Sequence, residues 1–249
     1  MIPKTLHYIW LGNGRKSNLT NICINSWYEK LGDYEIVEWN EQNLDLDQIA
    51  ENNRFFKECR KRKLWAFMAD YLRLYVLYQH GGVYVDTDIQ VLKSFDGILN
   101  HGFAVGYEFA PMWGKDAQVV GAGVIAAEKG NPTLKRILDF YDNEIWDVDF
   151  YTIPMVLDYV LKKCDKTDYV VYPVEYFAPF SPQNASAIDA QRSSITKNTV
   201  CIHWYSGSWL DNLQVRMFLK CKHIKNPVKK KIKQGKLLAG YFYRKVVKR

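Results

Sequence analysis

Apolar side chains fall on nearly every face of the segment from Leu64 to Tyr78. This pattern predicts a helix that is buried on all sides, because an amphipathic surface helix would show one polar face. Two charged residues interrupt it, Asp70 and Arg73, and their spacing of three residues places them on one face. A carboxylate and a guanidinium inside a buried helix must pair with each other or meet a polar ligand.

A glycine pair, a short apolar run and two aspartates follow this helix. Gly81 is expected to end the helix and Gly82 to let the chain turn sharply. Residues 83–85, Val-Tyr-Val, are typical of a central strand. Asp86 and Asp88 then lie at its carboxyl end, where open α/β sheets place ligands. Two carboxylates on one turn can both reach a hard divalent cation. A polar turn in which the aspartates cap backbone N–H groups is the plain alternative.

The remaining pattern predicts an α/β fold with a central mixed sheet. Runs at 2–10 and 34–39 enclose a helical segment at 18–31, and the three together read as a βαβ unit. The run at 119–127 is small and apolar, as a central strand close to a ligand would be. Other strands are expected at 103–107, 169–173 and 199–204, and other helical segments at 45–62, 130–140 and 153–162.

The composition is that of an ordinary globular protein. The chain has 249 residues, 48% hydrophobic and 24% charged, which is enough for one sizeable domain. Its five cysteines are scattered without Cys-x-x-Cys spacing, so we expect no zinc site, no disulfide framework and a reducing compartment. No apolar stretch approaches a membrane span, and the first residues lack a signal-peptide core. We therefore expect a cytoplasmic location.

Positive charge is concentrated near the C-terminus. Residues 212–249 contain thirteen of the 34 Lys and Arg residues and none of the 27 Asp and Glu residues. We therefore divide the chain into a mildly acidic body, 1–211, and a basic amphipathic tail, 212–249. Lysines interleaved with apolar and aromatic residues are typical of a helix on an anionic membrane surface, so a peripheral position on the inner face of the membrane is expected. A solvated extension or a contact between copies of the chain is the alternative. No nucleic-acid partner is expected, because the body lacks a basic face.

Two motifs of this chain occur together in one known family. Residues 66–73 and 77–88 read Ala-x-x-Ala-Asp-x-x-Arg and Leu-Tyr-x-x-Gly-Gly-Val-Tyr-x-Asp-x-Asp, and residues 2–12 read Ile-Pro-Lys-x-Leu-His-x-Ile-Trp-x-Gly. These motifs resemble the DXD sugar-binding region and the first strand of glycosyltransferase family 32. That family includes capsular-polysaccharide transferases and the fungal initiating α-1,6-mannosyltransferase, and the large glucosylating toxins are distant relatives. The resemblance implies a GT-A-like fold and a nucleotide-diphosphate sugar donor.

The resemblance also implies roles for the residues around the aspartate pair. Asp86 and Asp88 would hold Mn²⁺ or Mg²⁺ on the donor diphosphate. Asp70 and Arg73 would bind the hydroxyls of the donor sugar and the diphosphate. These four residues are our candidate catalytic set, although no general base or nucleophile is assigned.

Further candidates come from more distant parts of the chain. Trp10 would stack on the donor base, and Asn40 follows the second strand where nucleotide contacts occur; for Trp10 a plain core position is the alternative. His203 lies in the last predicted strand and is the candidate third metal ligand, unless it is a hydrogen-bonded histidine among aromatic residues. Ser208 and Trp209 match a Ser-Trp pair that closes over the donor diphosphate in the toxin relatives.

The function expected from these residues is metal-dependent, retaining transfer of a sugar to a hydroxyl of a lipid-linked glycan in polysaccharide biosynthesis, such as that of a capsule. Two other classes of protein share some of these features. A phosphatase of the Asp-x-Asp kind would place its nucleophile after the first strand, whereas this pair follows residue 80. A non-catalytic glycan- or nucleic-acid-binding module would account for the aromatic residues and the tail, but not for a buried Asp-x-x-Arg beside two aspartates.

Overall fold

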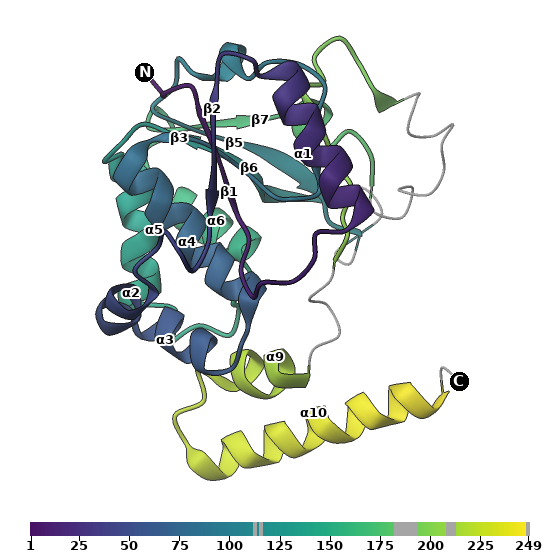
Figure 1. The fold of residues 1–249 in the computed structure, drawn as a ribbon. Helices are drawn as coiled ribbons and strands as arrows, with labels where there is room; N and C mark the ends of the chain where they lie inside the picture. Colours follow the sequence, from purple (N-terminus) through teal and green to yellow (C-terminus); the bar gives the residue numbers. More distant parts are fainter. Residues whose placement is uncertain (112–113, 115–116, 182–193, 208–212, 248–249) are drawn as a thin grey trace.

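A six-stranded mixed sheet runs through the centre of the computed structural model, in the order β2-β1-β3-β6-β5-β7 (Figure 1). The structure describes residues 1–249 except 112–113, 115–116, 182–193, 208–212 and 248–249. The strands of the sheet are β1 (Thr5–Ile9), β2 (Glu35–Trp39), β3 (Gly82–Val85), β5 (Phe103–Phe109), β6 (Gln118–Ala127) and β7 (Val170–Tyr172). Two short strands, β4 (Ile89–Val91) and β8 (Cys201–His203), form a separate antiparallel pair.

The parallel part of the sheet brings three strand ends to one edge. β1 pairs in parallel with β2 on one side and with β3 on the other. Helix α1 (Asn18–Lys30) connects β1 to β2, which confirms the predicted βαβ unit. β6 runs antiparallel to both β3 and β5, so the sheet is mixed, as expected. The loops that follow β1, β2 and β3 therefore lie side by side, and the aspartate pair is in one of them.

Helices cover both faces of the sheet. α1 lies on one face, and α4, α5 and α6 lie on the other (Figure 1). The bounds of the body helices are α2 (Leu46–Asn52), α3 (Arg54–Lys61), α4 (Trp65–His80), α5 (Pro132–Asn143), α6 (Ile153–Leu161) and the short α7 (Val174–Phe177), with a 3₁₀ turn η1 (Asp96–Ile98). The side chains of β1 contribute to the hydrophobic core on each face. Leu6 and Tyr8 pack in the core under α1, and Ile9 packs in the core under α4.

The junction between α4 and β3 depends on its two glycines. Gly81 has φ +70° and its N–H donates to Leu77 O at 2.7 Å, which ends the helix. Gly82 has φ +111°, and a Cβ there would lie 2.5 Å from Thr5 O. The ring of His7 donates from Nε2 to Gly81 O at 2.7 Å, so it fastens β1 to this turn. Only glycine can lead the chain from α4 directly into the centre of the sheet here.

The C-terminal elements are two short turns of helix and one long helix. α9 (Leu213–Phe218) and the 3₁₀ turn η4 (Leu219–Cys221) place Val215 and Leu219 in the main core. α10 (Pro227–Val247) packs on α9 and η4 and otherwise extends beside the body (Figure 1). Within the part of the chain that the structure describes, every helix is too short or too polar to cross a membrane. The division into a body and a tail stays a prediction.

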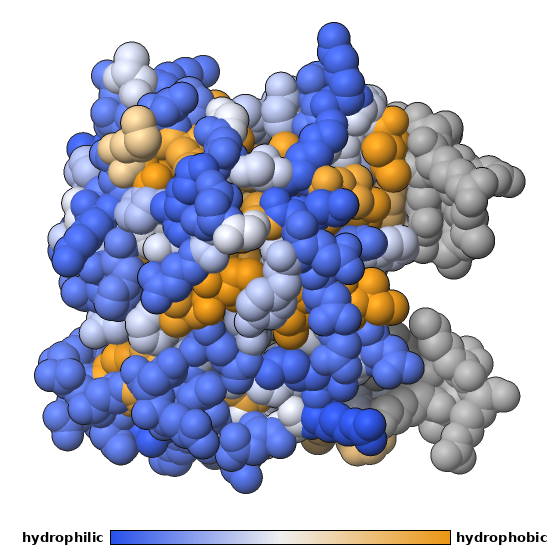
Figure 2. Space-filling view, turned by 45° about the horizontal axis from the view of Figure 1, so that its top comes forward, coloured by the Kyte–Doolittle hydropathy of each residue, from blue (hydrophilic) through white to orange (hydrophobic). Residues whose placement is uncertain are grey.

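Apolar residues on the surface are scattered. The face shown in Figure 2 is mostly hydrophilic, with apolar patches between the hydrophilic side chains. Single exposed apolar residues are normal on a folded protein. An aligned row of them is more informative, and α10 carries one, which is described below.

Candidate active site

Asp86 and Asp88 lie in the turn between β3 and β4. The Asp86 N–H donates to Gly123 O at 2.9 Å, which continues the pairing of β3 with β6 by one residue. The Ile89 N–H then donates to Asp86 O at 3.0 Å and closes a tight turn. Both carboxylates therefore project from the carboxyl edge of the sheet, as the sequence predicts.

The small β4–β8 sheet brings His203 to the aspartates. Ile89 and His203 are register partners, and the Trp204 N–H donates to Asp88 O at 3.0 Å. One ligand atom each of Asp86, Asp88 and His203 lie within 4.8 Å of one another. Two carboxylate oxygens and an imidazole nitrogen suit Mn²⁺ well and Mg²⁺ less readily, and they leave positions for phosphate oxygens and water. The three side chains thus fit a divalent cation.

The two aspartates differ in their electrostatic surroundings. Burial acts to raise the pKa of Asp88, but His203 and the Ser206 N–H, which donates to Asp88 Oδ2 at 2.8 Å, hold that pKa well below its usual range. Burial raises the pKa of Asp86, and the nearby Arg73 guanidinium opposes this rise. Asp88 is therefore a fixed negative charge in the absence of any cation.

Arg73 joins the core helix to the aspartate pair. Its guanidinium lies 2.9 Å from Asp70 Oδ1 and 3.2 Å from Asp86 Oδ1, and it donates to Ala122 O at 2.7 Å. The Tyr84 hydroxyl donates to Asp86 Oδ1 at 2.8 Å. Burial raises the pKa of Asp70 to about 7, against the attraction of Arg73. The expected pairing of the two buried charges of α4 is confirmed, and the pair contacts the candidate metal site directly.

Trp10 directly follows β1, at the same edge of the sheet. Its Nε1–H donates to Gly14 O at 2.9 Å, and the ammonium of Lys16 lies 5.4 Å from the centre of its ring. The ring is partly exposed and packs against the core under α1. Its stacking on a base stays a prediction.

The remaining three sequence candidates are Asn40, Ser208 and Trp209. Asn40 follows β2, but its Oδ1 accepts from the Gln42 N–H at 2.9 Å and its Nδ2 donates to Glu38 at 3.1 Å. Both ends of this side chain thus shape their own turn, and a nucleotide contact stays a prediction. Ser208 and Trp209 lie outside the described residues.

The structure adds a carboxylate that the sequence did not single out. Glu108 of β5 is partly buried, accepts from the Gly123 N–H at 3.2 Å and lies 3.5 Å from His203 Nδ1. The sequence indicated its position only indirectly, through the run of small residues at 119–127 that forms most of β6. A Cβ on Gly121 would lie 2.3 Å from Glu108 Oε1, so this glycine makes room for the carboxylate.

Comparison with known proteins gives this site a context. Residues 17–104 match the family model described as a glycosyltransferase sugar-binding region containing a DXD motif. Toxin Afp18 of Yersinia ruckeri is 26% identical over 169 residues, which are 55% of this chain and 8% of the toxin. Inositol phosphoceramide mannosyltransferase 3 of Schizosaccharomyces pombe is 24% identical over 139 residues, 55% of this chain and 36% of that protein. The chain thus spans well under half the length of these relatives.

A solved structure shares the fold over a larger part of the chain. A glycosyltransferase involved in the glycosylation of the major capsid of PBCV-1 superimposes with a TM-score of 0.51 at 12% identity, covering 81% of this chain and 94% of that one. This likeness shows the fold, which is of the GT-A type. The range that matches the sugar-binding region, 17–104, includes Asp86-Thr87-Asp88.

Proposed function

We propose that this chain transfers a sugar from a nucleoside-diphosphate donor to a hydroxyl group with the help of a divalent cation. The observation that carries this proposal is the meeting of Asp86, Asp88 and His203 next to the buried guanidinium of Arg73. These groups come from three distant segments of the chain, and a simple capped turn would need none of them except the aspartates. Manganese is our preferred cation because an imidazole is among the ligands.

Each residue has a task that follows from its position. Asp86, Asp88 and His203 would hold the cation, which when bound neutralises charge on the leaving diphosphate. Arg73 presents a second positive charge to the same anion. Asp70, which keeps Arg73 in place, offers a carboxyl oxygen to hydroxyls of the donor sugar. Together they favour departure of the diphosphate, which is the difficult step of the transfer.

Retention at the anomeric carbon is part of the proposal and rests on the family resemblance. We assign no nucleophile, and in this scheme the leaving phosphate itself takes the proton of the acceptor hydroxyl. Trp10 would stack on the base, and its place at the end of β1 supports this, because β1 and β3 end at the same edge.

The acceptor that we propose is a glycan linked to lipid, in polysaccharide biosynthesis. One support is the relative in Schizosaccharomyces pombe, whose name describes a mannosyltransferase that acts on inositol phosphoceramide, a lipid. The other support is α10. Val228, Ile232, Phe242 and Tyr243 are each more than half exposed. Their separations of four, fourteen and fifteen residues place them on one side of the helix.

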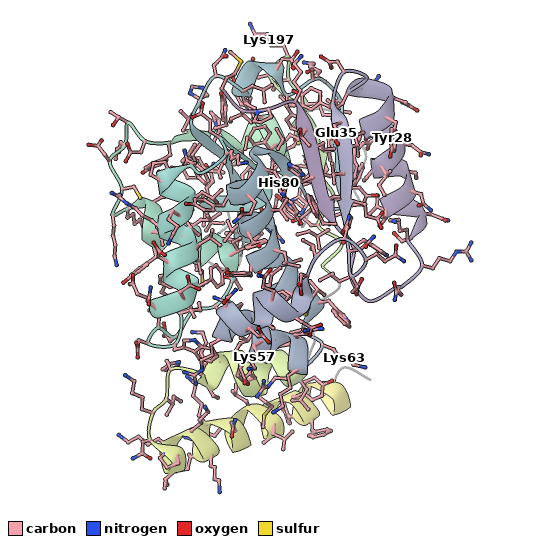
Figure 3. All side chains as sticks on the ribbon, turned by 60° about the vertical axis from the view of Figure 1, so that its left-hand side comes forward. Tyr28, Glu35, Lys57, Lys63, His80 and Lys197 are labelled. Carbon is pink, nitrogen blue, oxygen red and sulfur yellow. The ribbon has the colours of Figure 1, made fainter. Side chains whose placement is uncertain are left out.

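Positive charge surrounds this apolar row. Lys229, Lys231 and Lys236 are exposed beside it, and α10 contains no acidic residue. Figure 3 shows Lys57 and Lys63 at the end of the body that faces the C-terminal helices. An apolar row flanked by lysines suits the surface of an anionic leaflet, where each lysine contributes about 1 kcal/mol. We propose that α10 docks the enzyme on such a surface, at the inner face of the membrane.

Vesicle flotation tests this docking. The protein should bind vesicles that contain phosphatidylglycerol, bind neutral ones less, and lose binding when Ile232 and Phe242 are changed to Ser. Ile22→Ser is the matched control, since Ile22 is also about half exposed but lies on α1. Equal binding by the double variant would contradict the docking, and so would a stable dimer that the same substitutions dissociate.

Thermal unfolding tests the proposed reaction class. Mn²⁺ with UDP or GDP should raise the melting temperature, because a ligand at a hundred times its Kd stabilises the fold by about 2.7 kcal/mol. Asp88→Asn should remove this shift. A shift produced by an oligonucleotide instead would favour the nucleic-acid-binding alternative, and an unchanged shift in Asp88→Asn would contradict the assigned site.

A further inference from the structure

We propose that Glu108 is a positioning residue that fixes His203 as a ligand through its Nε2 atom. The inference rests on the metal-dependent function proposed above and adds a residue to it. Glu108 does not belong to the DXD region, and it lies beyond the residues that the family model matches.

His203 lies between two carboxylates. Its Nε2 is 3.5 Å from Asp88 Oδ1, on the side of the candidate metal site, and its Nδ1 is 3.5 Å from Glu108 Oε1. Nδ1 is buried and makes no hydrogen bond of good geometry. Without a cation, both ring nitrogens face a carboxylate at the same distance, so the ring can carry a proton on each. When Nε2 gives up its proton to bind a cation, the proton on Nδ1 stays beside Glu108, as it does where a carboxylate supports a ligating histidine. Glu108 therefore selects the form of the ring in which Nε2 can bind.

The strands around Glu108 are shaped to admit it. β5 has a register irregularity against β6 between Val105 and Tyr107, immediately before Glu108. Such irregularities re-aim the side chains that follow them. On β6, a Cβ at Gly121 would lie 2.3 Å from Glu108 Oε1, and one at Gly123 would lie 3.1 Å from His203 Nδ1. Gly121 thus leaves the space that Glu108 occupies, and Gly123 relieves a close approach to the ring of His203.

A second contact fixes the plane of the imidazole. The Tyr205 ring stacks on His203 with centres 4.1 Å apart and an interplanar angle of 24°. Tyr205 has φ +51°, an uncommon conformation for a non-glycine residue. The next residue, Ser206, donates its N–H to Asp88 Oδ2. Tyr205 thus sets the ring plane, and Glu108 sets which edge of the ring bears the proton.

Glu108 has no other ionic partner among the described residues. Its polar contacts there are His203 and the Gly123 N–H, and the nearby charge of Asp88 opposes its own. Burying a carboxylate costs free energy unless it is paired and hydrogen-bonded. A glutamine could accept from the Gly123 N–H equally well, so the backbone contact alone does not require the charge.

Mn²⁺ titration of the full chain, read by the electron paramagnetic resonance signal of free Mn²⁺, tests the inference without any measurement of transfer. Glu108→Gln should weaken Mn²⁺ binding by about tenfold or more, as loss of a carboxylate behind a ligating histidine does. His203→Ala should weaken it as well, and Glu108→Gln should have no further effect in the His203→Ala background. Glu38→Gln, another partly buried carboxylate, is the matched control and should leave Mn²⁺ affinity unchanged.

Two results would overturn the positioning role. One is wild-type affinity in Glu108→Gln, and the other is the same loss with and without His203, which would indicate a structural effect only. Failure of the wild-type chain to bind Mn²⁺ would instead contradict the proposed function and this inference with it. Should Glu108→Gln not fold, nitrogen NMR of the wild-type protein with diamagnetic Cd²⁺ decides, since a metal on Nδ1 of His203 contradicts the role.

Discussion

Arg73 contacts several groups of the site at once. Its guanidinium touches two carboxylates and a backbone carbonyl, and it lies over the ring of Tyr84 at 4.7 Å. Burial acts to lower the pKa of Arg73, but Asp86 and Asp70 outweigh it and raise that pKa. The side chain is therefore a permanent cation that holds the carboxylates of α4 and of the aspartate pair in place.

Replacing Arg73 alone should destabilise the fold strongly. Arg73→Met leaves buried Asp70 and partly buried Asp86 without their cation, and the expected loss is about 3–5 kcal/mol in the free energy of unfolding. Adding Asp70→Asn should recover part of the loss, because one of the unpaired charges is removed. Urea unfolding measures both. Arg60→Met, which breaks an exposed pair with Asp47, is the control and should change little. A loss in Arg73→Met no larger than in the control would contradict this account.

His7 should make stability depend on pH. The ring is buried, donates to Gly81 O and accepts from Trp39 Nε1 at 3.0 Å, and burial lowers its pKa from about 6.5 to about 4. The neutral ring therefore stabilises the fold fully above pH 6.5, and this contribution is lost as the pH falls through 4. The shift corresponds to as much as about 3 kcal/mol.

Denaturation of wild type and His7→Gln across pH 4 to 7 checks this linkage. The advantage of the wild type should shrink as the pH falls. A difference that stays constant over the range would show that His7 does not titrate in this way.

For individual residues, the sequence predicts a contact between two side chains only where their separation along one helix determines it. Asp70 and Arg73 are three residues apart on a helix with no polar face, so their pairing could be expected. Glu108 gives no such signal, because alternation along a strand tells which residues share a face but not which segment lies opposite. His203 was a candidate by position, and its contact with Asp88 depends on pairing between residues more than a hundred positions apart.

At the scale of elements, the periodic segments were predicted well and their junctions less so. The expected strand at 119–127 and the core helix after Leu64 agree with β6 and α4 to within one or two residues. The polar region at 45–62 is instead two helices, because Asn53 adopts an extended conformation and caps α3 by accepting from the Phe56 N–H. β4 and β8 each have three residues, too few for a local pattern to reveal their pairing.

The glycines of β6 predict how the stability of the fold responds to alanine substitutions. Gly121→Ala should cost about 1–3 kcal/mol in the free energy of unfolding, since its Cβ would overlap Glu108. Gly235→Ala on α10 has no atom within 4 Å of the new Cβ and should stabilise the helix by about 0.5–1 kcal/mol. Chemical denaturation of the two variants measures the contrast. Equal effects would show that Glu108 does not fill the space beside Gly121.

In the whole molecule, the candidate active site and the basic residues lie in two different places. The carboxyl edge of the sheet holds the aspartate pair, and the end of the body near Lys57 and Lys63 adjoins α9 and α10. The Arg62 guanidinium, at the end of α3, lies 3.9 Å from the centre of the Phe218 ring of α9. Body and C-terminal helices therefore form one basic end, and this arrangement supports docking on an anionic surface.

The most direct test of the central claim is release of nucleoside diphosphate from a panel of UDP- and GDP-sugars, with an added glycan acceptor or water. We predict that one donor is consumed, that release requires Mn²⁺ or Mg²⁺ and stops with EDTA, and that Asp88→Ala abolishes it while the variant stays folded by circular dichroism. Substantial release in the absence of a divalent cation, or by the folded Asp88→Ala variant, would contradict the account.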